Sequence, residues 1–138
     1  MAASHPEAVR NMLANFVTSL IDTGSAEGKL VFLTASDIAV ATLRFSRPAF
    51  APAVSGRAVA NPITADPSAI GGIIAKAVAC DNDGNEVFSC SVTAPGGDGD
   101  IVVSVVDVQP GDAVEINDGQ LSYEQTCCAI HSPPRARV

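Results

Sequence analysis

The sequence predicts a mainly β fold: an antiparallel β-sandwich or barrel-like domain with one N-terminal amphipathic helix. Short runs of β-forming residues alternate with Gly, Pro, Asn and Asp turn residues from position 29 onward. No helical pattern separates these runs, which argues against parallel βαβ units. Apolar residues at helical spacing are found only near the N-terminus. We therefore expect an N-terminal helix within residues 1–24, a β-domain over 25–126 and a C-terminal tail over 127–138.

The composition excludes several classes of protein. The net charge of -7 argues against nucleic acid as a partner, because phosphate binding needs clustered Lys and Arg. No stretch approaches the roughly 20 apolar residues of a membrane-spanning helix. The N-terminal residues lack the basic leader and continuous apolar core of a signal peptide, so we expect no secretion. The four cysteines are then expected to be free thiols, with Cys80 and Cys90 on opposite faces of a hairpin.

The N-terminal segment has the pattern of an amphipathic helix over about residues 5–23. Ser4 and Glu7 fit a capping box at its start, and Gly24 fits the stop after its last turn. We expect its apolar stripe to pack on the protein's own sheet, and docking on a neighbouring subunit is the alternative. The stripe consists of Val9, Met12, Leu13, Phe16, Val17, Leu20 and Ile21.

The pattern changes to strands after the helix. Runs rich in β-forming residues predict strands at Lys29–Ala35, Ile38–Arg44 and Val54–Ala60. Pro48 ends the second run, because proline cannot continue a central strand. The later run Ile101–Val108 is apolar on both faces and is expected to be a central strand.

The stretch 71–93 predicts a β-hairpin that turns at Asp83-Gly84. A two-residue type I′ turn there would fix the register, because both of its central residues need positive φ. One face of this hairpin is small and apolar, and we expect it to face the core. Its pairs are Ala79–Phe88, Ala77–Cys90 and Ala75–Val92, and the mixed face pairs Cys80–Val87, Val78–Ser89, Lys76–Ser91 and Ile74–Thr93.

A second hairpin is predicted at the C-terminal end of the β-domain, with Asp118-Gly119 as its two-residue turn. Its register places two apolar pairs on the core face and leaves Glu115 and Ser122 pointing outward. The apolar pairs are Ile116–Leu121 and Val114–Tyr123.

Six short segments follow one another in a characteristic order between about residues 41 and 123. They are Ala41–Phe45, Pro48–Phe50, Ala60–Asp66, Gly84–Phe88, Gly96–Asp100 and Pro110–Ile116. In this order and spacing, the stretch resembles a family of small virion proteins of tailed bacteriophages. The resemblance implies a structural particle protein with a β-sandwich-like fold and without catalytic residues.

The resemblance also implies a location and partners. Its first interpretation is a head decoration, or cement, protein that caps the capsid lattice, and a tail, neck or fibre-attachment component is the alternative. The implied partners are the major capsid protein or other virion proteins and further copies of the chain, for example in a trimer. The implied location is the virion, assembled in the host cytoplasm.

Residues that carry chemistry in other proteins form no recognisable site in this sequence. His5 and His131 lie in the predicted first helical turn and in the tail, away from a nucleophile. Cys127, Cys128 and His131 could supply soft metal ligands, but zinc sites draw on a second ligand pair that the sequence lacks. We therefore expect no enzyme, no catalytic residue, no bound metal and no cofactor.

Two acidic clusters and a glycine-rich loop are better explained as turns. The first cluster comprises Asp81, Asp83 and Glu86 and the second Asp98 and Asp100, and neither has the ligand spacing of a calcium loop. No helix start or lysine follows the glycines at 96–99, as a phosphate-binding loop requires. A remaining alternative class is an adhesion or carbohydrate-binding sandwich, which would need exposed aromatic side chains; the chain has only Tyr123 and five Phe.

Overall fold

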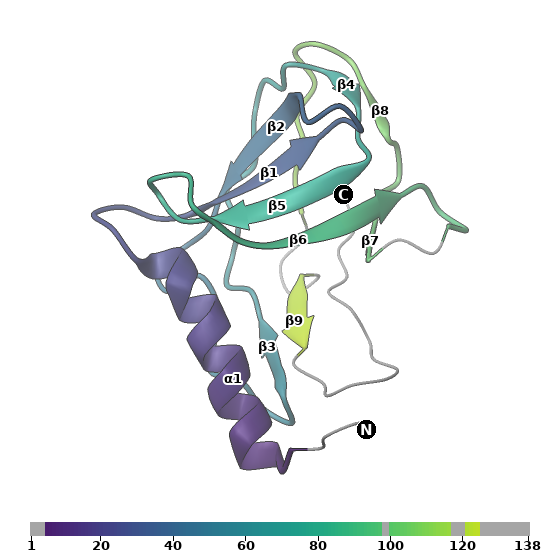
Figure 1. The fold of residues 1–138 in the computed structure, drawn as a ribbon. Coiled ribbons are helices and arrows are strands. Elements are labelled where there is room, and N and C mark those ends of the chain that lie inside the picture. Colours follow the sequence, from purple (N-terminus) through teal and green to yellow (C-terminus); the bar gives the residue numbers. More distant parts are fainter. Residues whose placement is uncertain (1–4, 98–99, 117–120, 125–138) are drawn as a thin grey trace.

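A curled five-stranded sheet forms the largest part of the fold, and one helix is formed near the N-terminus of the chain (Figure 1). The computed structural model describes residues 5–97, 100–116 and 121–124. The large sheet has the order β2-β1-β5-β6-β7, and two small sheets pair β3 with β9 and β4 with β8. The predicted class, a mainly β fold with an N-terminal helix, is confirmed. The strands are β1 Lys29–Leu33, β2 Ala39–Arg44, β3 Arg57–Val59, β4 Gly72–Ile73, β5 Lys76–Cys80, β6 Glu86–Thr93, β7 Ile101–Val102, β8 Asp107–Val108 and β9 Ser122–Glu124.

Strands β1 and β2 form the first hairpin, and each lies within a run that the sequence predicts to be a strand. Their antiparallel register pairs Leu30 with Leu43 and Phe32 with Ala41. All four of these side chains are buried, because alternate residues of a strand point to the same face. The turn between the strands places Asp37 at φ 67°, a left-handed conformation that Asp adopts more readily than most residues.

The register predicted for the hairpin of β5 and β6 is confirmed over four pairs. These pairs are Lys76–Ser91, Ala77–Cys90, Val78–Ser89 and Ala79–Phe88. The apolar face points to the core, where Ala77, Ala79, Cys90 and Val92 are buried. Ile74, which we placed on the mixed face, is also buried. Its N–H bonds to the Val106 carbonyl, beside the small β4–β8 sheet.

The turn of this hairpin differs from the prediction. Gly84 has φ 90°, but Asp83 does not have positive φ, so the turn is not type I′. The loop is longer, since the Asp81 N–H bonds to the Asn85 carbonyl and the Gly84 N–H to the Asp81 carbonyl. As a result Cys80 faces Glu86 across a bulge instead of Val87.

The valine-rich run 101–108 is not a single central strand, contrary to the prediction. It contains β7, at the edge of the large sheet and parallel to β6, and β8, which pairs with β4. Between the two strands Val103 is buried, whereas Ser104 and Val105 are exposed. The run is apolar because each of its halves lines the core from a different sheet.

Two further strand predictions are corrected by the pairing. Only Arg57–Val59 of the predicted strand 54–60 is a strand, since Ser55 and Gly56 have positive φ in a tight turn before it. The second hairpin register is wrong: Val114 pairs with Asp66 and Tyr123 with Ala58. Its turn at 118–119 lies outside the described residues. Of the side chains assigned there, Val114, Ile116 and Leu121 are buried and Glu115 is exposed as predicted, but Ser122 is buried.

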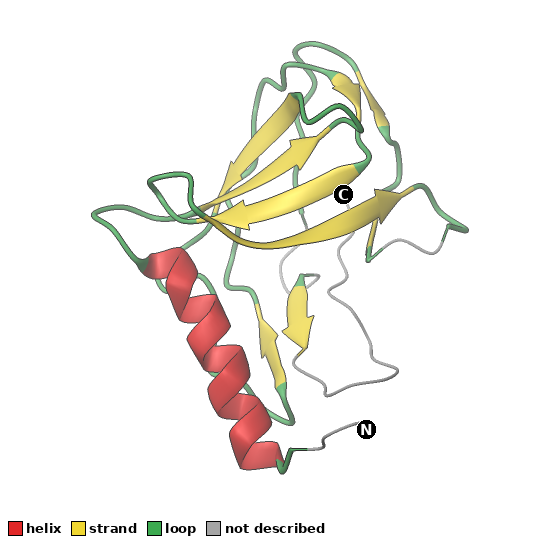
Figure 2. Ribbon diagram, in the orientation of Figure 1, coloured by secondary structure: helices red, strands yellow, loops and turns green. Residues whose placement is uncertain are grey.

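The N-terminal helix matches the predicted span closely. Helix α1 covers Glu7–Ser19, a 3₁₀ turn continues over Leu20–Asp22, and Gly24 follows with φ 98°. The N-cap residue is Pro6 and not the predicted Ser4, and the side chain of Pro6 has no hydrogen-bond acceptor. Ser4 lies outside the described residues. In Figure 2 α1 lies below the curled sheet, where it contacts β3 and β9.

Candidate functional site

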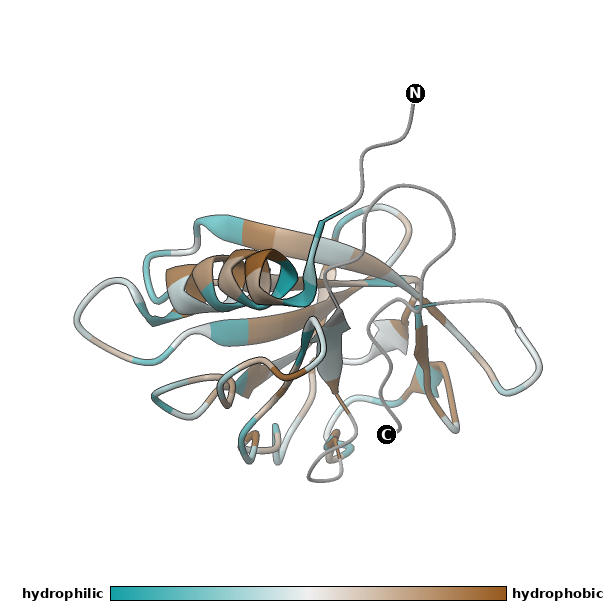
Figure 3. Ribbon diagram, turned by 90° about the horizontal axis from the view of Figure 1, so that it is seen from below, coloured by the Kyte–Doolittle hydropathy of each residue, from teal (hydrophilic) through white to brown (hydrophobic). Residues whose placement is uncertain are grey.

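Helix α1 turns only one edge of its apolar stripe toward the protein. Its buried residues are Ala14 and Thr18, and the 3₁₀ turn that follows it buries Ile21. The Thr18 hydroxyl donates to the Ala14 carbonyl at 2.9 Å. Met12 and Phe16, on roughly the opposite side of the helix, are 69% and 64% exposed. We call Met12 and Phe16, one turn apart, the helix ridge. In Figure 3 hydrophobic colouring extends over much of α1.

The orientation of α1 is fixed by polar side chains of the helix. The side chains of Asn11 and Asn15 accept hydrogen bonds from the N–H groups of Gly56 and Ala53, at 2.7 and 2.8 Å. These bonds hold the loop before β3 against the helix. Asn15 neighbours Phe16 in sequence, so the same contacts leave the helix ridge facing away from the domain.

A second apolar surface lies at the other end of the molecule. Four large apolar side chains are each more than half exposed there: Ile38, Ile70, Ile73 and Val105. Backbone contacts bring their segments together, because the Ile70 N–H bonds to the Val40 carbonyl near Ile38 and β4 pairs with β8, which follows Val105. We call these four residues the sheet-end patch. Figure 1 shows β4 and β8 at the opposite end of the fold from α1.

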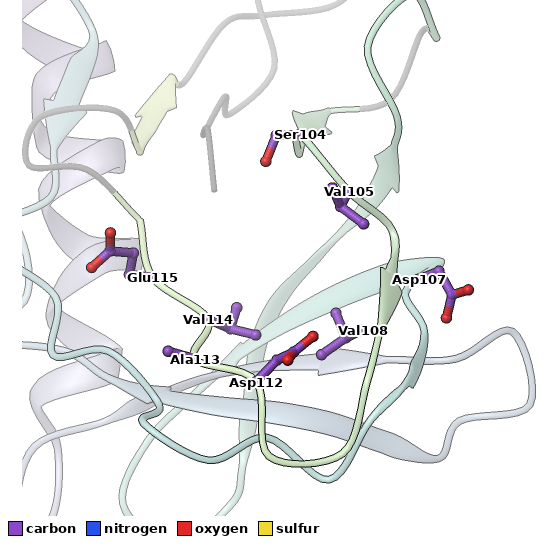
Figure 4. Close-up of a pocket in the computed structure, with 8 residues that line it drawn as sticks. All are labelled: Ser104, Val105, Asp107, Val108, Asp112, Ala113, Val114 and Glu115. Atoms are coloured by element: carbon purple, nitrogen blue, oxygen red, sulfur yellow. The ribbon is translucent and has the colours of Figure 1, made fainter.

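A cleft of about 390 Å³ opens between two arms of the chain, residues 104–108 and 112–115 (Figure 4). Val108 and Val114, one on each arm, point toward one another across the floor, with Asp112 between them. The carboxylates of Asp107 and Glu115 stand at the two outer sides. We call this space the acidic cleft. A second cleft of about 300 Å³ lies between α1 and the loop 48–52.

The carboxylates at the acidic cleft make few hydrogen bonds with the rest of the described protein. The Asp112 side chain accepts one hydrogen bond from the Gln109 N–H at 3.0 Å, and the Asp107 side chain accepts one from the Gln109 amide at 3.2 Å. No ion pair joins Asp107, Asp112 or Glu115 to a described basic residue. The ion pair that the described residues do show joins Lys76 to Asp37.

Other carboxylates hold the fold together. The Asp81 carboxylate accepts hydrogen bonds from the Asn85 amide and N–H, the Asp83 N–H and the Thr23 hydroxyl, at 2.9 to 3.2 Å. The bonds from Asn85 are the main reason why the pKa of Asp81 lies below its ordinary value. Asp81 thus ties the chain after the helix to the β5–β6 loop, 58 residues away.

Among the residues considered for chemistry, those that the structure describes are not brought into one site. His5 is exposed and lies just before α1. Asp100 exchanges hydrogen bonds with Ser91, so this residue of the second acidic cluster stabilises the loop between β6 and β7. Cys80 and Cys90 are buried free thiols, and burial raises the pKa of Cys90 to about 12. Cys127, Cys128, His131 and Asp98 lie outside the described residues. Within the described ranges, no three His, Cys, Asp or Glu residues are grouped to hold a metal ion.

The two apolar surfaces and the acidic cleft were not singled out from the sequence. Met12 and Phe16 were assigned to a stripe that packs on the sheet, with docking on a neighbouring subunit as the alternative. Asp107 was assigned to a central strand and Glu115 to the outward face of a hairpin. A usable signal was present: α1 has only Arg10 as a charged residue between Glu7 and Asp22. A helix with one solvent-facing side normally carries more charge there.

Comparison with known proteins gives no match: no family model, no curated protein and no solved structure is similar to the chain. In the described part of the chain, no helix is long and apolar enough to cross a membrane.

Proposed function

We propose that the protein is a non-enzymatic structural component of a tailed-bacteriophage virion, and specifically a head decoration protein that bridges capsid subunits. The observation that carries the proposal is the presence of two separate apolar surfaces, the helix ridge and the sheet-end patch, at opposite ends of the fold. A protein that opposes expansion of a shell has to contact two neighbouring subunits at once. Two surfaces supply these two contacts.

The helix ridge gains free energy when an apolar protein surface covers it and removes it from water. Burying a Phe or Met side chain on association contributes about 1.5–3 kcal/mol each. Their spacing of one helical turn is that of a helix laid into an apolar groove. On this proposal α1 packs on its own domain through Ala14 and Thr18, and on a neighbouring virion subunit through Met12 and Phe16.

The charge and the sequence resemblance support the same function. A net charge of -7 keeps assembled particles apart and disfavours contact with the packaged nucleic acid. The segments between residues 41 and 123 resemble those of small phage virion proteins. The partners proposed here are the major capsid protein and further copies of the chain in an oligomer such as a trimer, within the virion.

A tail, neck or fibre-attachment component would use the same two surfaces and is the nearest alternative. An adhesion or carbohydrate-binding domain is less well supported. Sugar binding usually relies on exposed aromatic faces, and among the six aromatic residues, all of them described, only Phe16 is exposed.

The test is binding of the purified protein to phage heads and to phage tails that lack it. After sedimentation, bound copies per particle are counted for the wild type and for a variant with Met12→Ser and Phe16→Ser. A matched control is Val54→Ser, which changes a residue that is 70% exposed outside both surfaces. We expect saturable binding to heads that the helix-ridge variant loses and the control keeps. Binding to tails alone would move the protein to the tail or neck, and binding to neither would overturn the proposal.

A further inference from the structure

We infer that the outer edge of β6 binds an extended segment of a partner protein, which adds one strand to the large sheet and carries basic residues at its ends. This inference does not depend on the proposed virion function. Strand β6 covers Glu86–Thr93, but β7 pairs only with Val92 and Thr93 at its end. In Figure 1, β7 accordingly lies beside the last part of β6. Residues 86–90 therefore form an edge of the sheet that no described strand covers.

The backbone groups of this edge point away from the sheet. The Val92 N–H bonds toward β5, to the carbonyl of the residue before that strand, at 3.0 Å. Every second residue of an antiparallel strand bonds to the same neighbour, so the N–H and C=O groups of Val87 and Ser89 face the outer side. The Ser91 N–H has the same direction and bonds to the Asp100 carboxylate at 3.1 Å. Among the described residues, no group bonds to the outward backbone of Val87 or Ser89.

The opposite edge of the same sheet is covered. Val40, Thr42 and Arg44 of β2 all bond through their outward backbone groups to the segment 64–71, at 2.8 to 3.3 Å. Natural sheets that leave an edge uncovered usually carry Lys or Pro on it, which prevents pairing with another chain. Strand β6 has neither, and its one charged residue is Glu86 at its first position. The edge of β6 is therefore able to pair with a further strand.

The side chains along the edge indicate the chemistry of the added strand. Phe88, on the core face, is only partly buried, and its ring centroid lies 5.1 Å from that of Tyr123. Ser89, on the other face, is exposed. Residues opposite each other on neighbouring strands pack on the same face of a sheet. The complementary segment thus alternates apolar residues, which pack beside Phe88, with small hydroxyl residues beside Ser89.

The charge around the edge favours a basic partner over a second copy of this chain. Residues 77–134 contain ten acidic residues and no Lys or Arg. Glu86 and Asp83 are exposed at the start of the edge, and the Asp100 carboxylate lies at its other end beside Ser91. Pairing of β6 with its own copy would bring these carboxylates together, and like charges across an interface are unfavourable. A segment with a basic residue at each end is attracted instead.

The experiment is titration of the full-length protein with the synthetic peptide acetyl-Lys-Thr-Val-Thr-Val-Thr-Lys-amide, followed by NMR and amide hydrogen exchange. We expect saturable binding in which exchange of the Val87 and Ser89 N–H groups slows about tenfold or more, because the added strand bonds to them. Two matched control peptides have every backbone N–H methylated, or glutamate in place of both lysines, and we expect neither to bind. Equal binding of the methylated peptide, or no binding of the parent peptide at millimolar concentration, would overturn the inference.

A pair of variants tests the edge from the side of the protein. Ser89→Pro removes the outward N–H but no bond that the described residues make, and proline is tolerated on the open side of an edge strand. Ser89→Thr is the matched control, because it keeps this N–H. We expect the peptide to bind about tenfold more weakly to Ser89→Pro and within about twofold of the wild type to Ser89→Thr. Wild-type affinity in a folded Ser89→Pro variant would contradict strand addition. If that variant does not fold, the methylated peptide decides the question on the wild type.

Hydrogen exchange of the protein without peptide separates a partner segment from other occupants of the edge. We expect rapid exchange of the Val87 and Ser89 N–H groups at every protein concentration. Slow exchange that appears only as the protein sediments as a dimer would replace the partner with a second copy. Slow exchange in the monomer would show that the chain itself covers the edge. Either result would overturn the inference.

Discussion

Replacing Ile21 by Ala tests whether the helix packs on its own domain. Ile21 is fully buried where the 3₁₀ turn meets the sheet. The change removes three carbon atoms, worth about 2.4 kcal/mol at about 0.8 kcal/mol for each buried CH₂ group. The surroundings cannot close the gap easily, because a Cβ built on Gly28 would lie only 2.4 Å from the Ile21 side chain and 2.5 Å from the Cys80 carbonyl. With the remaining void, we expect a loss of about 2.5–4 kcal/mol in the free energy of unfolding.

The assay is urea unfolding followed by circular dichroism. With an m-value near 2 kcal/mol/M, the midpoint of Ile21→Ala should fall by about 1–2 M. Phe16→Ala is the matched control, since it removes a larger side chain from the same helix, one that is 64% exposed. Its free energy of unfolding should change by less than about 0.5 kcal/mol. Equal losses in the two variants, or a larger loss for Phe16→Ala, would refute the described orientation of the helix.

Three further predictions concern the Cys90 thiol, the β5–β6 loop at Asp81 and the contact of Gly28 with Ile21. Cys90 should resist alkylation in the folded protein at pH 8 and react on unfolding. Because the pKa of Cys90 in the folded protein is about 12, the free energy of unfolding should fall as pH rises from about 9 to 12. The variant Cys90→Ala should lose that part of the fall. In Asp81→Asn, the free energy of unfolding should fall less in acid than in the wild type. The lowered pKa of Asp81 stabilises the fold above about pH 4, and this contribution disappears as pH falls through the pKa of Asp81 in the folded protein. The same dependence of stability on acid pH in both proteins would contradict this prediction. Gly28→Ala should lower the free energy of unfolding by about 1–3 kcal/mol in the urea assay, because its Cβ would meet Ile21 and the Cys80 carbonyl, and no loss would show that the junction is looser than described.

The alternation of core-facing and outward-facing residues along the chain was sufficient to predict the register between β5 and β6. The register of Ala77 with Cys90 follows from the apolar face of the hairpin, because a slip of one residue would turn that face outward. The same argument failed at the turn. There the Asp81 carboxylate accepts the N–H groups of Asp83 and Asn85 and stabilises a longer loop than the Asp-Gly signal indicates.

Features that depend on contacts between distant segments could not be predicted. The run 101–108 divides between two sheets because β4, which is distant from β8 in sequence, offers a second partner to Asp107 and Val108. The rotation of α1 depends on Asn11 and Asn15, whose partners lie in the loop before β3. The acidic cleft likewise exists only because the arms 104–108 and 112–115 lie side by side.

The central proposal, that the protein bridges neighbouring subunits of a phage head, is tested most directly by electron cryo-microscopy of heads saturated with it. The proposal predicts density for this fold at fixed positions of the capsid lattice, with the helix ridge against one capsid subunit and the sheet-end patch against another. Density that touches a single capsid subunit through a different face, or heads without bound protein at saturating concentration, would contradict it.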